Sequence, residues 1–105
     1  FDAIVDGVAV IDGERQIGRA NRAFAQLVAK PVNELAGKKI CTLVHGREEP
    51  ISDCPLERAI ATGSLQPTSL RETFLGNRLL DISVFPIPQK KGTSQRYVHL
   101  IRVVE

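Results

Sequence analysis

The residues best suited to chemistry gather in the middle of the chain, where both cysteines and one of the two histidines fall between positions 41 and 55. Cys41 and His45 are four residues apart, so a helix here would place the sulfur and the imidazole on one face. Cys54 follows later in the same segment and could return to the same place. Thiolate and imidazole together suit zinc or another borderline-soft metal. The segment therefore admits a metal site, an oxidisable thiol pair, or a set of structural side chains.

We favour the structural interpretation of this segment. Free cysteine is among the most buried residue types, and His45 could bond a backbone carbonyl and hold its loop in place. A thiol pair ranks second, because disulfides in cytosolic proteins are usually redox-sensing. A metal site ranks third, because Cys41, His45 and Cys54 supply three ligands and a structural zinc takes four; Asp53 or Glu48 could supply another. We expect both cysteines to be reduced and free of metal, but near enough to interact.

Enzyme signatures are absent from the sequence. It contains no Gly-rich phosphate loop, no His-Glu-x-x-His, no Gly-x-Ser-x-Gly and no Cys-x-x-Cys. His99 falls in the middle of a strand-like run, and we interpret it as a surface or interface residue rather than a catalytic base. We therefore expect no catalytic residues and no enzymatic activity from this domain alone.

Length and composition bound the class of protein. A chain of 105 residues with 43% hydrophobic and 25% charged residues is typical of one globular domain, here residues 1–105. A net charge of +2, with basic residues scattered among few aromatics, does not indicate nucleic-acid binding. No run of 18 apolar residues and no signal peptide is visible, so we expect a cytoplasmic domain without membrane contact. The chain begins at Phe1 and lacks methionine, which suggests a fragment of a longer polypeptide.

The elements that must position these residues begin with a strand, a tight turn and a second strand. Asp12-Gly13 is a strong turn signal, because glycine accepts a positive φ and aspartate bonds its own backbone. Asn21 can cap a helix over about 22–29, which Pro31 should stop. A second helix is expected over 55–62, capped by Asp53 and ended at Gly63. Three strands are expected to close the chain, at Thr68–Phe74, Asn77–Pro86 and Gln95–Val104.

The last strand is apolar on both faces. Alternation places one set of side chains on one face, Tyr97, His99, Ile101 and Val103, and another set opposite, Val98, Leu100, Arg102 and Val104. A strand of this kind is covered on both sides, one cover being the domain's own helices. The second cover is expected to be another copy or a flanking helix on an outer face that includes residues 8–11 and 98–104. Phe1, Ile4 and Val5 have helical spacing and could begin such a helix, and a charge at Ile101 or Val103 should break the dimer without unfolding the domain.

This order of elements resembles the PAS family. The hairpin that runs directly into a helix at Asn21 is typical of the start of such domains, and 33–38 is similar to the family's x-Glu-Leu-x-Gly-Lys segment. The closing pair of strands, the first ending at Pro86, is also similar, so the resemblance covers nearly the whole chain. It implies an α+β fold: a five-stranded antiparallel sheet with helices on one face.

The resemblance also implies a function. PAS domains are sensory, ligand-binding and dimerising modules of signal-transduction proteins such as bacterial sensor histidine kinases of two-component systems or transcriptional regulators. They form homodimers through the outer sheet face and pass a signal to a downstream effector domain in the same chain. A small-molecule ligand would lie between the inner sheet face and the region from about Phe24 to Ile60, with Thr42, His45 and Arg47 as the nearest anchors. The alternatives are a thiol-redox or metal sensor using Cys41, His45 and Cys54, and a ligand-free constitutive dimerisation module.

The resemblance does not identify a cofactor. Haem-binding relatives carry their iron ligand, a histidine, on the helix equivalent to 55–62, and this helix has none. The Asn-Cys-Arg-Phe-Leu-Gln signature of photoactive flavin relatives is missing as well. A subset of the family resembles 41–55 but often has an extra cysteine where this chain has Ile51 and Ser52. We therefore expect neither haem nor a photoactive flavin, and the ligand stays unknown.

Overall fold

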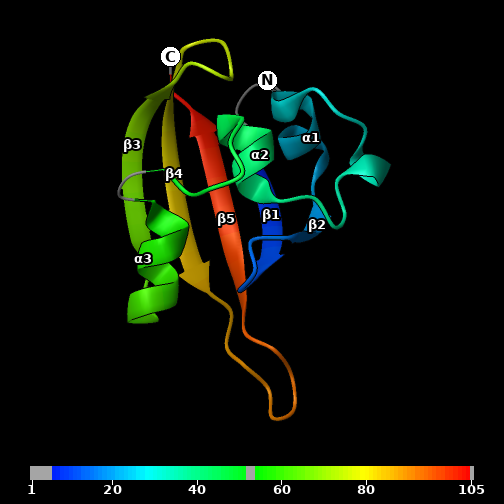
Figure 1. The fold of residues 1–105 in the computed structure, drawn as a ribbon, viewed down its shortest axis with the longest axis vertical. Coiled ribbons are helices and arrows are strands. Elements are labelled where there is room, and N and C mark those ends of the chain that lie inside the picture. Colours follow the sequence, from blue (N-terminus) through cyan, green and yellow to red (C-terminus); the bar gives the residue numbers. More distant parts are fainter. Residues whose placement is uncertain (1–5, 52–53, 105) are drawn as a thin grey trace.

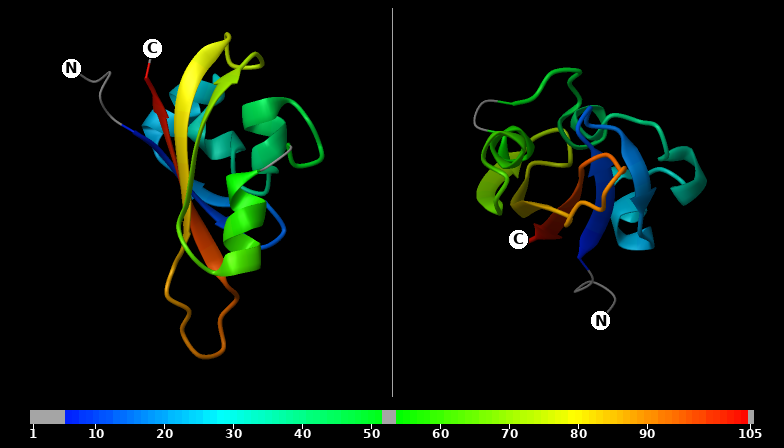
Figure 2. Two further views of the ribbon diagram at one scale, coloured as in Figure 1. Left: turned by 90° about the vertical axis from the view of Figure 1, so that its left-hand side faces the viewer. Right: turned by 90° about the horizontal axis from the view of Figure 1, so that it is seen from below.

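Five antiparallel strands form one sheet, and the helices lie across one of its faces (Figures 1 and 2). The computed structural model describes residues 6–51 and 54–104. The strand order is β2-β1-β5-β4-β3, so the first and last strands lie side by side in the sheet. This is the α+β fold that the sequence predicted. The elements are β1 (Gly7–Asp12), β2 (Ile17–Ala20), α1 (Arg22–Val28), the 3-10 helix η2 (Val32–Glu34), α2 (Ile40–His45), α3 (Pro55–Thr62), β3 (Gln66–Glu72), β4 (Arg78–Pro86) and β5 (Arg96–Val103).

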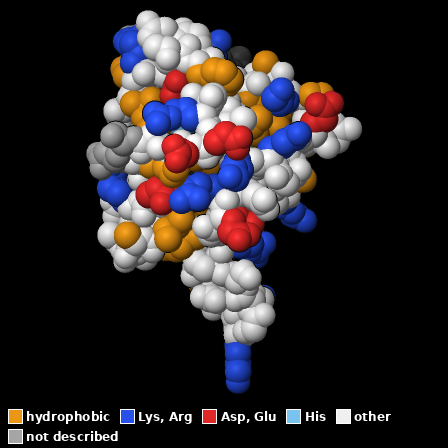
Figure 3. All heavy atoms as spheres, viewed as in Figure 1, with side chains coloured by type: hydrophobic (Ala, Val, Ile, Leu, Met, Phe, Trp, Pro, Cys, Tyr) orange, Lys and Arg blue, Asp and Glu red, His pale blue; other side chains and the backbone are white. Residues whose placement is uncertain are grey.

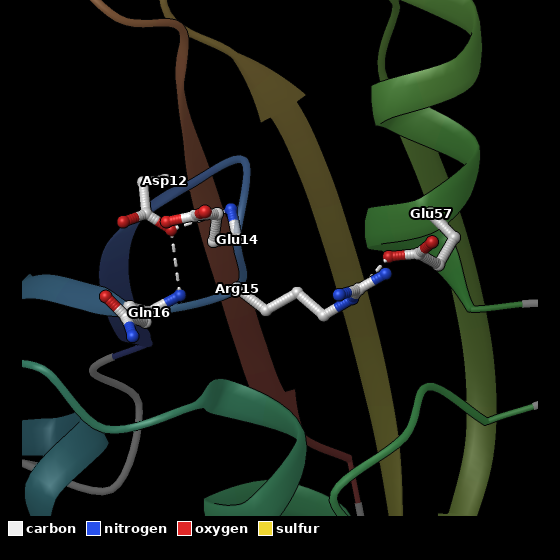
Figure 4. Close-up of polar contacts among 5 residues, drawn as sticks. All are labelled: Asp12, Glu14, Arg15, Gln16 and Glu57. Atoms are coloured by element: carbon white, nitrogen blue, oxygen red, sulfur yellow. Dashed lines mark hydrogen bonds and ion pairs between the residues drawn. The ribbon is translucent and has the colours of Figure 1, made fainter.

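The loop between β1 and β2 is longer than the tight turn that the sequence predicted. The Asp12 carboxylate accepts the backbone N–H groups of Glu14 at 2.8 Å and of Gln16 at 3.0 Å (Figure 4). The residue with positive φ is Arg15, at 71°, rather than Gly13, because the carboxylate bridges a loop with more residues than a two-residue hairpin turn. This loop aims the Arg15 side chain toward α3.

Asn21 caps α1, as predicted, and also ties the helix to the sheet. Its Oδ1 accepts the N–H of Phe24 at 2.9 Å and that of Val8 at 3.0 Å, while its Nδ2 donates to the carbonyl of Asp6 at 3.0 Å. The helix ends at Val28, one residue before the predicted end, because Ala29 adopts the left-handed conformation with φ 59°. One amide side chain thus fixes the angle at which α1 leaves the hairpin.

The second and third helices follow the sequence closely. The helix considered for Cys41 to His45 is present as α2, and it ends at Gly46, whose φ of 69° suits glycine. Helix α3 has the predicted bounds, with Pro55 in its first turn and Gly63 beyond its end. The cap position belongs to Cys54, which makes no side-chain capping bond; the predicted cap, Asp53, lies outside the described residues.

Strand β3 begins and ends two residues earlier than predicted. The run Thr68–Phe74 predicted a strand that continues to Phe74, but the chain turns after Glu72, and Asn77 adopts a positive φ of 57°. Phe74 therefore lies in the β3–β4 turn, residues 73–77, with 57% of its surface exposed. Strands β4 and β5 each begin one residue later than expected; β4 ends at Pro86 as predicted, and β5 ends one residue earlier, at Val103.

The core lies between the inner face of the sheet and the helices. Its sheet residues alternate along the strands, and each α-helix adds buried side chains, with more from α2 than from α1 or α3; the fully buried set includes Ala9, Ile11, Phe24, Val44, Leu56, Leu80, Ile82, Val84 and Ile101. Gly7 permits close packing of α1, since a Cβ there would meet Ile101 Cγ2 at 2.8 Å and Phe24 Cα at 3.2 Å. Among the described residues, no helix is long and apolar enough to cross a membrane.

Ile101 belongs to this core, which corrects its predicted place on the outer face. It pairs with Gly7 and Ile82 and is 1% exposed. Its neighbour Leu100 pairs with Val8 on the opposite face. The error lies in which face was taken as the outer one, because alternation groups the residues of a face but does not say which face the helices cover. The segment 1–5, which the sequence assigned to an incoming helix, lies outside the described residues.

Candidate functional site

Two histidines and one carboxylate lie at the inner face of the described part of the chain, each from a different element. They are His45 at the end of α2, Glu72 at the end of β3 and His99 in the middle of β5. His45 Nδ1 hydrogen-bonds Glu72 Oε1, and the two side chains are only 6% and 10% exposed. Because a buried polar group is costly unless it is paired, these residues are the strongest candidate for a functional site.

The carboxylate of Glu72 joins two elements. Its Oε1 bonds His45 on α2, and its Oε2 accepts the backbone N–H of Phe74 at 3.0 Å. The Phe74 ring in turn lies against Gly46, where an added Cβ would meet ring carbon Cδ1 at 2.6 Å. We call the His45–Glu72 pair together with the Phe74–Gly46 contact the α2 latch. It closes one end of the core by holding the β3–β4 turn against the end of α2.

His99 is the buried group without a partner. It is 4% exposed, and its Nδ1 has no hydrogen-bond partner among the residues that the structure describes. Ala9 and Val84 flank it on the neighbouring strands, and the Phe24 ring meets it edge to face at 6.4 Å between centroids. Burial, and then the charge of His45, lower the pKa of His99 to about 4, so its imidazole is neutral at pH 7.

The burial of His99 corrects the sequence interpretation. We expected a surface or interface residue, but alternation along β5 places it between Tyr97 and Ile101 on the inner face. Glu72 was not singled out from the sequence at all. Alternation groups Glu72 with Leu70 on β3 and His99 with Tyr97 and Ile101 on β5, but it does not say which face the helices cover.

Of the three anchors predicted for a ligand, Thr42 and Arg47 lie together at the surface and His45 lies in the core. His45 points into the core, but its partner is a carboxylate and not the expected backbone carbonyl. Thr42 and Arg47 are exposed, and the Thr42 hydroxyl donates to the Arg47 carbonyl at 3.4 Å. Thr42 also borders an open groove of about 520 Å³ that includes Lys30, Lys38, Lys39, Glu34 and Glu48.

Charges of both signs mix on the face that carries the helices. Figure 3 shows Lys and Arg side chains interspersed with Asp and Glu across this face, with apolar side chains between them. One pair crosses from the β1–β2 loop to α3, where Arg15 Nε lies 2.7 Å from Glu57 Oε2 (Figure 4). The face therefore offers no broad patch of one sign to a polyanion or polycation.

The two cysteines are buried and free. Burial raises the pKa of Cys41, the negative charge of a Cys54 thiolate raises it further, and Arg15 lowers it in part. Cys41 is therefore a thiol at neutral pH and a poor nucleophile. No group of three or more His, Cys, Asp or Glu side chains among 6–51 and 54–104 is arranged to hold a metal ion, because His45 faces Glu72.

Comparison with known proteins gives one family. A family model described as the PAS fold matches residues 1–105. No curated protein matches the sequence. A sensory box sensor histidine kinase from Vibrio cholerae has a similar structure, with a TM-score of 0.74 and 17% identity over 98% of this chain and 84% of that one.

Two further solved structures have the same fold. The PAS domain of nitrogen regulation protein NR(II) from Vibrio parahaemolyticus has a TM-score of 0.70 and 13% identity over 94% of this chain and 89% of that one. A domain of an HTR-like protein from Haloarcula marismortui ATCC 43049 has a TM-score of 0.72 and 16% identity over 95% and 98%. At these identities the likeness to solved structures concerns the fold.

Proposed function

The chain belongs to the PAS family, and we propose that it is the ligand-binding and dimerising sensory module of a multidomain signal-transduction protein. The similar domains from a sensor histidine kinase and from a nitrogen regulation protein support a host of this kind. A ligand in the core would favour one packing of the sheet, and the dimer would respond to that packing as a shift in population. The effector, a kinase or a transcriptional regulator, would lie elsewhere in the parent protein.

The proposed dimer is supported by an apolar strip on the outer face of the sheet. It crosses three strands and consists of Val8, Val10, Phe85, Val98 and Leu100, which are neighbours in register. These side chains are partly buried by one another, and the described helices lie on the opposite face (Figure 2). An uncovered apolar patch supports docking of a second copy, since a two-fold dimer can place the same strip on both sides of its interface.

Light scattering over a concentration series tests the dimer. We expect the wild-type chain to dimerise and Leu100→Glu to remain monomeric, because the change buries a charge in the interface but not in the core. Gln26→Glu, on the exposed side of α1, is the control with the same added charge and should dimerise like the wild type. A wild-type chain that stays monomeric at high concentration would contradict this part of the proposal.

The ligand would lie between the inner sheet face and α1, α2 and α3. His45, Glu72 and His99 support this location, because binding sites are mostly apolar with a few polar groups that fix orientation. Methyl NMR can test it during a screen of small metabolites, since Ile82 and Ile101 report on the inner face and Leu100 on the outer one. Shifts confined to the two isoleucines are expected; shifts confined to Leu100 would contradict an interior ligand.

Two alternatives give different results in the same experiments. A ligand-free dimerisation module would show the dimer without inner-face shifts from any compound. A thiol-redox sensor would form a Cys41–Cys54 disulfide, seen as the loss of two hydrogens in mass analysis of the non-reduced chain. The raised pKa of Cys41 disfavours thiol reactivity in the folded state, and the engagement of His45 by Glu72 disfavours a metal sensor that uses Cys41, His45 and Cys54.

A further inference from the structure

We propose that His99 is the hydrogen-bonding anchor for a small, neutral ligand that enters the core where the α2 latch holds the β3–β4 turn. The inference rests on the ligand-binding part of the proposed function and adds to it an anchor, a ligand class and a route. It starts from His99 Nδ1, the buried side-chain nitrogen that has no partner among the described residues.

The unpaired nitrogen indicates that the core is incomplete at this point. A buried polar atom without a partner is costly, and native structures keep few of them without a reason. No described side chain bonds this nitrogen: His45 Nδ1 and Glu72 Oε1 are bonded to each other, and the side chains beside His99, which are Ala9, Val84 and Phe24, have no polar atoms. A ligand that hydrogen-bonds His99 would supply the missing partner.

The surroundings of His99 select the chemical class. Its imidazole is neutral at pH 7, and in the tautomer with the proton on Nε2 the unpartnered Nδ1 carries a lone pair that accepts from a hydroxyl or an N–H group. An anion would be repelled by the Glu72 carboxylate of the α2 latch, and it would have to lose its hydration in an apolar core. The neighbours Ala9 and Val84 are fully buried, so a ligand must fit among closely packed side chains, which favours a small molecule over a large one. The class is thus a compact, mostly apolar molecule with one neutral hydrogen-bond donor.

We place the ligand's entry route at the α2 latch, because the latch has few contacts and lies close to His99. His45 acts on His99 electrostatically, so the end of α2 lies close to the anchor. The latch consists of the hydrogen-bonded His45–Glu72 pair and the ring of Phe74, which is more than half exposed. Lifting the β3–β4 turn breaks those contacts without disturbing the pairing of β4 with β5. Segments with few buried contacts open most easily.

Phenol, toluene and benzoate are suitable probes, because phenol and toluene share a shape and differ in one donor, and benzoate adds a negative charge. We expect phenol to bind about tenfold more tightly than toluene, as one hydrogen bond to a buried acceptor allows. Benzoate should bind more weakly than phenol. The ring carbon and nitrogen resonances of His99, followed by NMR, should shift with phenol and not with toluene.

Two variants test the hydrogen-bonding role of His99 and the entry route at the β3–β4 turn separately. His99→Phe keeps an aromatic ring but removes the acceptor, and it should abolish the preference for phenol over toluene. Phe74→Ala should raise the phenol association rate several-fold with little change in affinity, whereas Thr73→Ala, at an exposed position of the same turn, should leave the rate unchanged. Circular dichroism of each variant verifies the fold, and the His99 resonances of the wild type give a result that needs no variant.

The outcomes distinguish this inference from the function on which it rests. Equal binding of phenol and toluene, with inner-face methyl shifts from both, would overturn the anchor while leaving an interior ligand site. Tighter binding of benzoate than of phenol would overturn the ligand class, and equal rates for Phe74→Ala and Thr73→Ala would overturn the route. Binding of none of the probes would overturn the inference as a whole, and the metabolite screen would then decide the proposed function separately.

Discussion

At the scale of single residues, His99 makes the stability of the domain sensitive to acid. Its pKa falls from 6.5 to about 4 in the folded state, chiefly because the ring is buried. Between these values the unfolded chain binds a proton that the folded chain does not, so stability falls as the pH drops from about 6.5 to about 4. The loss attributable to this one group is of the order of 3 kcal/mol, and no part of it appears above pH 7.

Urea unfolding at pH 7.0, 5.5 and 4.5 measures this effect. The wild type should lose more free energy of unfolding across the series than His99→Phe, since phenylalanine does not titrate. Other acidic groups titrate in both proteins, and the difference between the two slopes isolates His99. Equal slopes would show that His99 is protonated as readily in the fold as in the unfolded chain.

Asn21 has a second testable role at this scale, because it serves the helix and the sheet together. Asn21→Ala removes the acceptor for Phe24 and Val8 and the donor to Asp6, so we expect a loss above the usual cost of a helix cap, toward 2 kcal/mol. Asn33→Ala, at an exposed position of η2, is the matched control and should cost little. Thermal unfolding of both variants checks this, and a similar small effect at both positions would contradict it.

The role of Asn21 can be predicted from the sequence, whereas the roles of His45 and His99 cannot. Asn21 could be recognised as a cap because its main partner, Phe24, lies three residues away in a local motif. The partner of His45 lies 27 residues away on another element, and the orphan state of His99 depends on packing from three strands and a helix. Local hydrogen bonds are encoded in short patterns, whereas long-range ones depend on the tertiary fold.

At the scale of elements, Glu72 connects α2 with the β3–β4 turn. Glu72→Ala leaves His45 and the Phe74 N–H unpaired, so we expect a loss of about 1–3 kcal/mol and faster hydrogen exchange in both the turn and α2. Glu48→Ala, which removes an exposed carboxylate from a loop, should change neither. Faster exchange in the turn alone would show that the His45 bond does not hold α2 in place.

The sequence was informative about elements where local signals are strong. The bounds of α3 follow from Pro55 and Gly63, and those of β4 and β5 from their apolar alternation. It erred where tertiary contacts decide, as at the end of β3, where Phe74 looks like a strand residue but packs against Gly46 in a turn. Thr42, in α2, and Arg47, beyond the end of α2, are exposed, and their role as ligand anchors stays a prediction.

At the scale of the whole molecule, the sheet separates two roles. Its inner face holds the core with the buried histidines, and its outer face holds the apolar strip. The sequence showed that both faces of the last strand are apolar but assigned Ile101 to the wrong one, since alternation alone does not say which face the helices cover. The charged substitution once expected at Ile101 would therefore unfold the domain, and Leu100 is the position that tests the interface.

The central claim is that one small domain binds a small molecule inside and a second copy outside. Native mass spectrometry of the chain as purified, over a series of protein concentrations, measures both in one experiment. We expect dimer ions that grow with concentration and carry an added mass that is lost on mild activation, as for a buried non-covalent ligand. Monomer ions alone at every concentration, with the mass of the bare chain, would contradict the account.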